Sequence, residues 1–161
     1  MIEKVLYECY NISKQINKLE FEGKIGMDVK SLYRKLNSIS YKELFEIEPE
    51  IFTVLSKTSF DDRLPYVNAY LTISNWFGTS LRSGVWTFYE VTKLEEIDTV
   101  LTYLKENNYT DLAEIFEKGV HDYQNPIYAK DFDYPEEWIE ESEEIDQWIM
   151  EHEEWLWQWE R

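Results

Sequence analysis

Apolar residues recur at intervals of three and four along most of the chain, which is the spacing of one face of an α-helix. Residues 2–20 and 94–104 follow this pattern closely, and the whole chain of 161 residues contains only 5 glycines and 4 prolines. Few helix breakers favour long regular elements over many turns. We therefore expect an all-α fold: one domain over residues 1–161, built as a bundle of about seven to nine helices.

Several short motifs predict where these helices begin. The sequences "SYKE" at residues 40–43 and "TKLE" at 92–95 match the capping box, in which a Ser or Thr side chain caps the first turn. Pro49 and Pro135 suit the first turn of a helix, and Asp61 or Asp62 suits the start of another. Thr110 is the predicted cap of the helix that continues through "DLAEIFEKGVHDY".

Other segments predict breaks. The sequence "NWFGTS" at residues 75–80 predicts an interruption, after which Ser80 begins a new element. Residues 80–91 are rich in β-branched and aromatic side chains, so helix and strand both remain open there. The longest predicted loop covers residues 123–134, and Pro135 then opens the final helix.

Composition excludes several classes of protein. Hydrophobic residues make up 43% of the chain and aromatic residues 17%, which is not a disordered composition. The single Cys9 rules out an intrachain disulfide framework and fits a reducing compartment. No apolar run is long enough to cross a membrane, and the N-terminus lacks a signal-peptide pattern. We expect a cytoplasmic protein.

No motif indicates catalysis or metal binding. The two histidines, His121 and His152, and Cys9 do not have metal-ligand spacing, and no phosphate-binding glycine loop is present. Neighbouring residues on a helix point about 100° apart, so His121 and Asp122 do not form a natural catalytic pair. We interpret His121 as a residue near a helix C-terminus, where the helix dipole favours it. The sequence thus predicts no enzyme, no cofactor and no metal.

Negative charge is concentrated at the C-terminal end. The net charge is -17, and residues 131–161 hold 13 of the 33 acids with Arg161 as their one Lys or Arg. Five of the seven tryptophans lie in the same segment. Such a chain repels nucleic acid and anionic membranes, so a macromolecular partner is expected to be a basic protein.

The final helix, from residue 136 onward, separates its apolar and acidic residues. At 100° per residue, Trp138, Ile145, Ile149 and Leu156 share one side, which predicts that this side packs on the rest of the protein. The acids on the opposite side are Glu136, Glu137, Glu140, Glu141, Glu143, Glu144, Glu151 and Glu154.

Ile139, Met150 and Trp157 lie away from the main apolar side, so at least one of them should be exposed unless another part of the chain, a homodimer mate or a partner covers it. The predicted partner-binding residues are Glu136, Glu140, Glu144, Glu151, Glu154 and Trp157.

The central sequences "LPYVNAYL" (64–71), "LRSGVWTFYE" (81–90) and "LTYLKENNYTDLAEIFEKG" (101–119) resemble a family of small, acidic, all-α bacterial proteins that includes a DNA-mimic protein. Ser83-Gly84-Val85-Trp86 stands where that family has asparagine, two glycines and an aromatic residue. The resemblance implies a helical, often dimeric protein without catalysis. The motif residues Leu81, Val85, Trp86 and Phe88 are expected in the core.

These features lead to one main functional expectation and two alternatives. The main one is a non-enzymatic acidic protein that imitates DNA and occupies a basic DNA-binding protein. The first alternative is an immunity protein that neutralises a toxin, in which central tryptophans would dominate the interface. The second is an enzyme with a site of carboxylates, because 33 acids offer many pairs.

Overall fold

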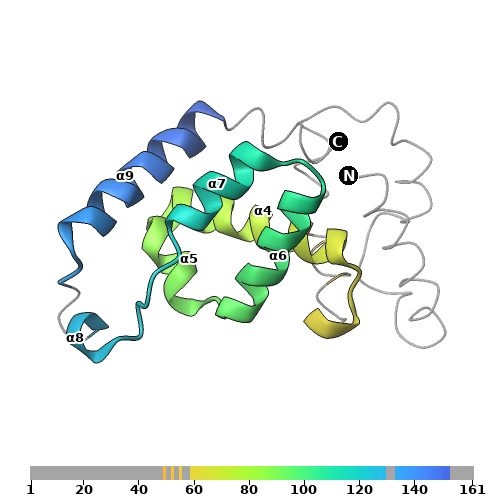
Figure 1. Ribbon diagram of the computed structural model, residues 1–161, viewed down its shortest axis with the longest axis horizontal. Coiled ribbons are helices and arrows are strands. Elements are labelled where there is room, and N and C mark those ends of the chain that lie inside the picture. Colours follow the sequence, from red (N-terminus) through yellow and green to blue (C-terminus); the bar gives the residue numbers. More distant parts are fainter. Residues whose placement is uncertain (1–48, 50–51, 53–54, 56–58, 130–132, 153–161) are drawn as a thin grey trace. The chain divides into compact units, whose positions relative to one another are not determined.

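A computed structural model describes Pro49, Phe52, Leu55 and residues 59–129 and 133–152 (Figure 1). These residues form helices and no strand, which confirms the all-α prediction for this part of the chain. It contains six α-helices, α4 to α9, and one 3-10 turn, against about seven to nine helices predicted for the whole chain. The predicted helices before residue 49, Cys9, and the predicted positions of Glu154, Leu156 and Trp157 lie outside the described residues.

The chain divides into two compact units, Met1–Tyr70 with Trp157–Arg161, and Leu71–Leu156. In the first unit, the 3-10 turn η3 (Phe60–Asp62) is closed by the Ser59 hydroxyl, which donates a 2.5 Å hydrogen bond to Asp62. Helix α4 (Pro65–Ser83) begins after this turn, not at Asp61 or Asp62 as predicted. Its start at Pro65 follows from the fixed φ of proline, which suits the first helical position.

The predicted break at "NWFGTS" is wrong, because α4 continues through it to Ser83. Trp76 is fully buried and Phe77 nearly so, and their packing outweighs the cost of about 1 kcal/mol for a glycine inside a helix at Gly78. Ser80 is buried within α4 and does not begin a helix.

Gly84, with φ of 88°, separates α4 from α5 (Val85–Val91). Residues 80–91, for which the sequence allows either helix or strand, are therefore helical on both sides of Gly84. Val85 and Phe88 are buried as expected, and Trp86 is half-buried. Leu81 is 49% exposed, which corrects its assignment to the core, because it lies on the outward side of the last turns of α4.

The predicted capping box at Thr92 is also wrong. The Thr92 hydroxyl donates a 2.7 Å hydrogen bond back to the Phe88 carbonyl at the end of α5. Helix α6 (Leu94–Glu106) starts after Lys93 without a side-chain cap. The hydroxyl thus satisfies a carbonyl of the preceding helix in place of an amide of the next one.

Helix α7 (Thr110–Lys118) has Tyr109 as its N-cap, one residue before the predicted Thr110, and ends at Gly119. The helix therefore does not continue through His121 as predicted, and His121 lies in the loop three residues after Lys118. The predicted loop at 123–134 contains the short helix α8 (Pro126–Ala129). Helix α9 (Glu136–Glu151) follows Pro135 as predicted and has His152 as its C-cap.

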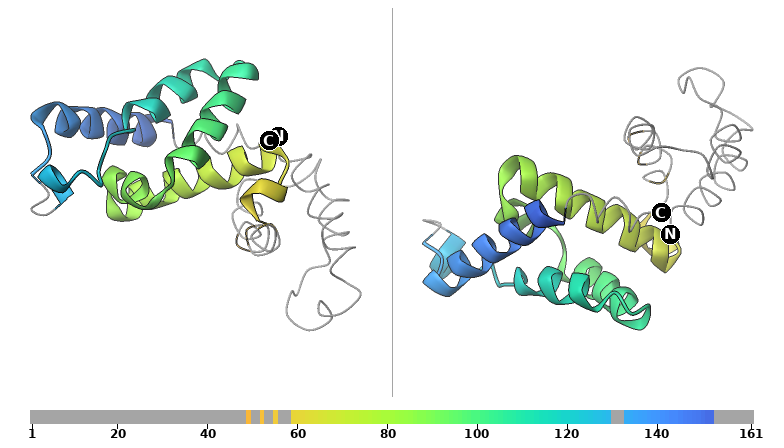
Figure 2. Two further views of the ribbon diagram at one scale, coloured as in Figure 1. Left: turned by 60° about the horizontal axis from the view of Figure 1, so that its bottom comes forward. Right: turned by 90° about the horizontal axis from the view of Figure 1, so that it is seen from above.

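In the second unit, α7 packs against both α6 and α9, and α9 also packs against α5 (Figures 1 and 2). Its core is aromatic at the centre, where the Trp76 and Phe116 rings meet edge to face at 5.4 Å. The fully or almost fully buried side chains around them include Phe88, Ile97, Leu104, Leu112, Ile145 and Ile149. This packing places one side of α9 against the protein and leaves the other side open.

Candidate functional site

The buried side of α9 is the one that the helical spacing predicts. Ile145 and Ile149 are completely buried, and Trp138 and Trp148 are half-buried. The Trp148 ring lies 6.3 Å from the ring of Trp76 on α4. We call this side, made of Trp138, Ile145, Trp148 and Ile149, the docking face of α9. Burial of these side chains fixes the helix and thereby orients its carboxylates.

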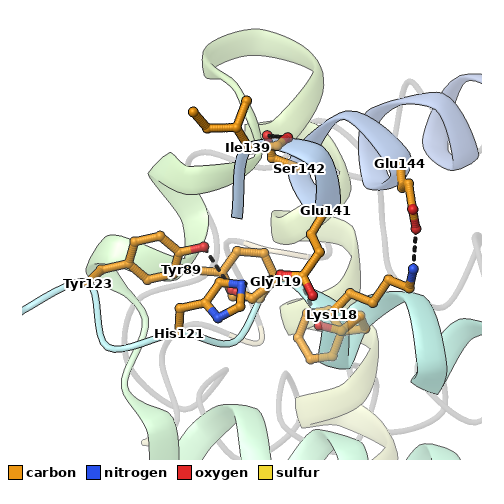
Figure 3. Close-up of polar contacts among 10 residues, drawn as sticks. Tyr89, Lys118, Gly119, His121, Tyr123, Ile139, Glu141, Ser142 and Glu144 are labelled. Atoms are coloured by element: carbon orange, nitrogen blue, oxygen red, sulfur yellow. Dashed lines mark hydrogen bonds and ion pairs between the residues drawn. The ribbon is translucent and has the colours of Figure 1, made fainter. Parts of the chain in front are cut away.

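His121, in the loop after α7, packs on the first turns of α9. Its ring stacks on Trp138 at 4.3 Å with an interplanar angle of 6°. Its Nε2 lies 2.6 Å from Glu141 Oε2, and Figure 3 shows His121 beside Glu141. Both atoms are buried and have no other hydrogen-bond partner among the described residues. Glu141 therefore turns toward the protein, which corrects its placement among the outward acids. His121 pairs with Glu141 and not with the exposed Asp122.

A second contact joins α7 to α9 nearby. The Lys118 ammonium forms an ion pair with the carboxylate of Glu144, a predicted partner-binding residue (Figure 3). Both side chains are largely exposed, so the pair contributes about 0–1 kcal/mol to stability. It nevertheless neutralises one carboxylate that the charge pattern assigned to a partner.

Three tyrosines beside these contacts act as hydrogen-bond donors. Tyr89 donates to the Phe116 carbonyl at 2.8 Å, and Tyr123 donates to the Gly119 carbonyl at 3.0 Å (Figure 3). Burial raises the pKa of both phenols above the usual value. Tyr134 donates to Glu90 at 2.7 Å, and burial together with this carboxylate raises its pKa to about 12. These phenols stay protonated at neutral pH and hold the α7–α9 connection in place.

The open side of α9 carries the carboxylates. Six of them are exposed: Glu136, Glu137, Glu140, Glu143, Glu144 and Glu151. Glu144 pairs with Lys118, so over the sixteen residues of the helix, about 24 Å long, the other five amount to one exposed carboxylate per about 5 Å of helix axis. Asp146 is only partly exposed, and burial raises the pKa of its carboxyl.

The structure therefore brings three predicted residues, Glu136, Glu140 and Glu151, to one exposed surface. Glu151 also accepts a 2.8 Å hydrogen bond from Gln147 on the same helix. The contacts of Lys118 with Glu144 and of His121 with Glu141 were not predicted. The paired residues are 20 or more positions apart in the sequence, so the spacing within one helix cannot predict their contacts.

The described residues contain neither a metal-binding cluster nor a membrane-spanning helix. No group of three His, Cys, Asp or Glu side chains there is placed to hold a metal ion. None of the described helices combines the length and the apolar character needed to cross a membrane.

Compared with known proteins, the chain matches no protein family, no curated protein and no solved structure. The resemblance to the acidic bacterial family therefore stays a prediction, and function is argued from the surface of α9.

Proposed function

We propose that this is a non-enzymatic binding protein whose exposed α9 carboxylates occupy the basic surface of a DNA-binding protein. The observation that carries the proposal is the exposed surface of α9, where five exposed carboxylates besides the Lys118-paired Glu144 lie on a helix held in place by buried residues. No Lys or Arg occurs between Asp131 and Glu160, so only a neighbouring element can neutralise this surface.

The spacing of charge supports mimicry of DNA. One strand of duplex DNA carries a phosphate about every 3.4 Å, and the exposed carboxylates other than Glu144 occur about every 5 Å along α9. Lys and Arg side chains that normally contact successive phosphates would meet carboxylates at similar intervals. Because both sets of charges are exposed, association should be fast and should weaken as salt is added.

The fixed position of α9 also supports a binding role. The docking face and the contacts of Lys118 and His121 hold the helix before any partner arrives. A preorganised surface avoids part of the entropy cost of binding that a disordered acidic tail would carry.

The test uses two variants with equal loss of charge. In the first, the α9 variant, Glu136, Glu140, Glu143 and Glu151 are changed to Gln. In the second, the control variant, four exposed acids of α6 and α7 are neutralised: Glu95→Gln, Asp98→Asn, Glu106→Gln and Glu114→Gln. Each protein is immobilised and exposed to lysate of the cells that make it.

Wild type and the control variant should retain a basic DNA-binding protein that duplex DNA and salt release, and the α9 variant should not. If the α9 variant retains the same protein equally well, the proposal is wrong. If the retained protein is a toxin that DNA does not release, the immunity function replaces mimicry.

A further inference from the structure

Two large apolar side chains are exposed on α9 outside the docking face. Ile139 is 40% exposed and Met150 is 64% exposed. They are eleven residues apart, which places them within about 20° of the same direction and about 16 Å apart along the axis. We call this pair the outer apolar face of α9. The predicted position of Ile139 and Met150 away from the main apolar side is thus observed.

The contacts of α9 locate this face on the helix. Glu141 and Glu144 mark the side toward α7, through their contacts with His121 and Lys118. At 100° per residue, the outer apolar face is about 160° from that side and about 130° from the centre of the docking face. It is therefore a third side of the helix, directed away from α7.

Carboxylates border the outer apolar face on both edges: the partly exposed Asp146 lies about 20° from Ile139 on one edge, and exposed glutamates lie along the other. Glu143 lies next to it around the helix, followed by Glu136 and Glu140 at successive steps of about 20° to 40°. All three are exposed. An apolar strip with a row of negative charges beside it complements a helix that has an apolar strip and a row of Lys or Arg.

We propose that the outer apolar face and its acidic border bind a basic amphipathic helix of a partner protein. This inference rests on the proposed function and adds that the bound segment of the partner is an amphipathic helix. Charge complementarity selects a basic occupant, because a second copy of this chain would bring another net charge of -17 and the same row of glutamates. The flexible Met150 side chain can adapt to different apolar partners.

The two kinds of contact respond differently to salt. Ion pairs between exposed groups weaken as ionic strength rises, whereas apolar burial does not. Binding should therefore fall with salt and then level off at a value set by Ile139 and Met150. A surface that only imitates phosphate would lose its affinity without such a plateau.

Two synthetic peptides of 18 residues serve as probes. One contains Lys and Leu, with Leu at helical spacing, and the other has the same Lys residues with every Leu replaced by Gln. Binding is measured by fluorescence anisotropy in 0.15 M and 0.5 M NaCl. The protein variants are Ile139→Ser/Met150→Ser and a matched control, Val91→Ser/Ile127→Ser, whose two side chains are each 75% exposed on other helices.

Wild type should bind the Lys–Leu peptide at least about tenfold more tightly than the Lys–Gln peptide. The Ile139→Ser/Met150→Ser variant should lose that preference, while Met150→Leu and the matched control should keep it. Because the substituted side chains are exposed, all variants should unfold at nearly the wild-type urea concentration.

Equal affinity of wild type for both peptides, or an equal loss in the matched control, would overturn the inference. If the four Glu→Gln substitutions of α9 abolish binding while Ile139→Ser/Met150→Ser changes nothing, the proposed function stands and the inference fails. If neither peptide binds, both fail. A wild-type dimer that becomes a monomer on Ile139→Ser/Met150→Ser, seen by analytical ultracentrifugation, would assign the face to a second copy instead.

Discussion

The same substitution, glycine to alanine, should have opposite effects at two positions of the second unit. At Gly119, an added Cβ would overlap the ring of Tyr89 and lie 2.8 Å from its hydroxyl oxygen. Tyr89 cannot move aside easily, because it is buried and donates a hydrogen bond to Phe116. Overpacking of this kind costs about 1–3 kcal/mol or more. Gly119→Ala should therefore lower the free energy of unfolding by that amount.

At Gly78, inside α4, an added Cβ would have no heavy atom within 4 Å. Alanine restricts the unfolded chain and favours a helix, so Gly78→Ala should raise the free energy of unfolding by about 0.5–1 kcal/mol. Gly84 tests backbone strain separately, since its φ of 88° disfavours any L-residue even though space is open around it. Gly84→Ala should cost about 1–3 kcal/mol.

Urea unfolding, followed by tryptophan fluorescence, measures all three variants. With a slope of about 1–3 kcal/mol per molar urea, a change of 1 kcal/mol moves the midpoint by roughly 0.3–1 M, which is easily resolved. Binding of a basic peptide to Gly78→Ala should equal that of wild type. A midpoint for Gly119→Ala at or above wild type would show that Tyr89 does not fill the space beside Gly119, and the packing argument would fail.

Three further results are expected. The free energy of unfolding should fall as the pH rises from about 10 to about 12, because Tyr134 holds its proton more tightly when folded, and Tyr134→Phe should reduce that fall in unfolding measured across this range. Asp146→Asn should stabilise the protein at pH 7 but not at pH 3, since burial disfavours the charged carboxylate; equal gains at both pH values would contradict this. Glu141→Gln should cost about 1–3 kcal/mol because its contact with His121 is buried, whereas Lys118→Gln should cost about 0–1 kcal/mol in the same urea assay.

The sequence was most informative where one local period decides the structure. The buried positions Ile145 and Ile149 follow from the 100° step of an isolated helix, and so does the exposure of Ile139 and Met150. The start of α9 after Pro135 follows from the fixed φ of proline. None of these properties depends on knowing which other element lies nearby.

Prediction failed where a tertiary contact competes with a local preference. "NWFGTS" contains a glycine and three residues of good N-cap type, yet the burial of Trp76 and Phe77 keeps α4 intact through Gly78. Thr92 suits the start of α6 by its spacing, but its hydroxyl reaches the Phe88 carbonyl first. In both cases the local sequence is compatible with two structures. The packing of Trp76 and Phe77 selects one in the first case, and the hydrogen bond from Thr92 to Phe88 selects one in the second.

The charges of the candidate site show the same limit, because the sequence of α9 alone does not determine which carboxylates meet a cation. Acids make up half of α9, so they are spread over much of its circumference. Some of them therefore lie at the edge toward a neighbouring helix. Which of them meets a cation depends on α7, because Lys118 and His121 come from its end and from the loop after it. Glu141 and Glu144 are thereby committed to holding α9 in place. The carboxylates directed away from α7 remain, and they are the ones beside Ile139, so the internal contacts narrow the partner-binding surface to the side of α9 where acidic and apolar groups meet.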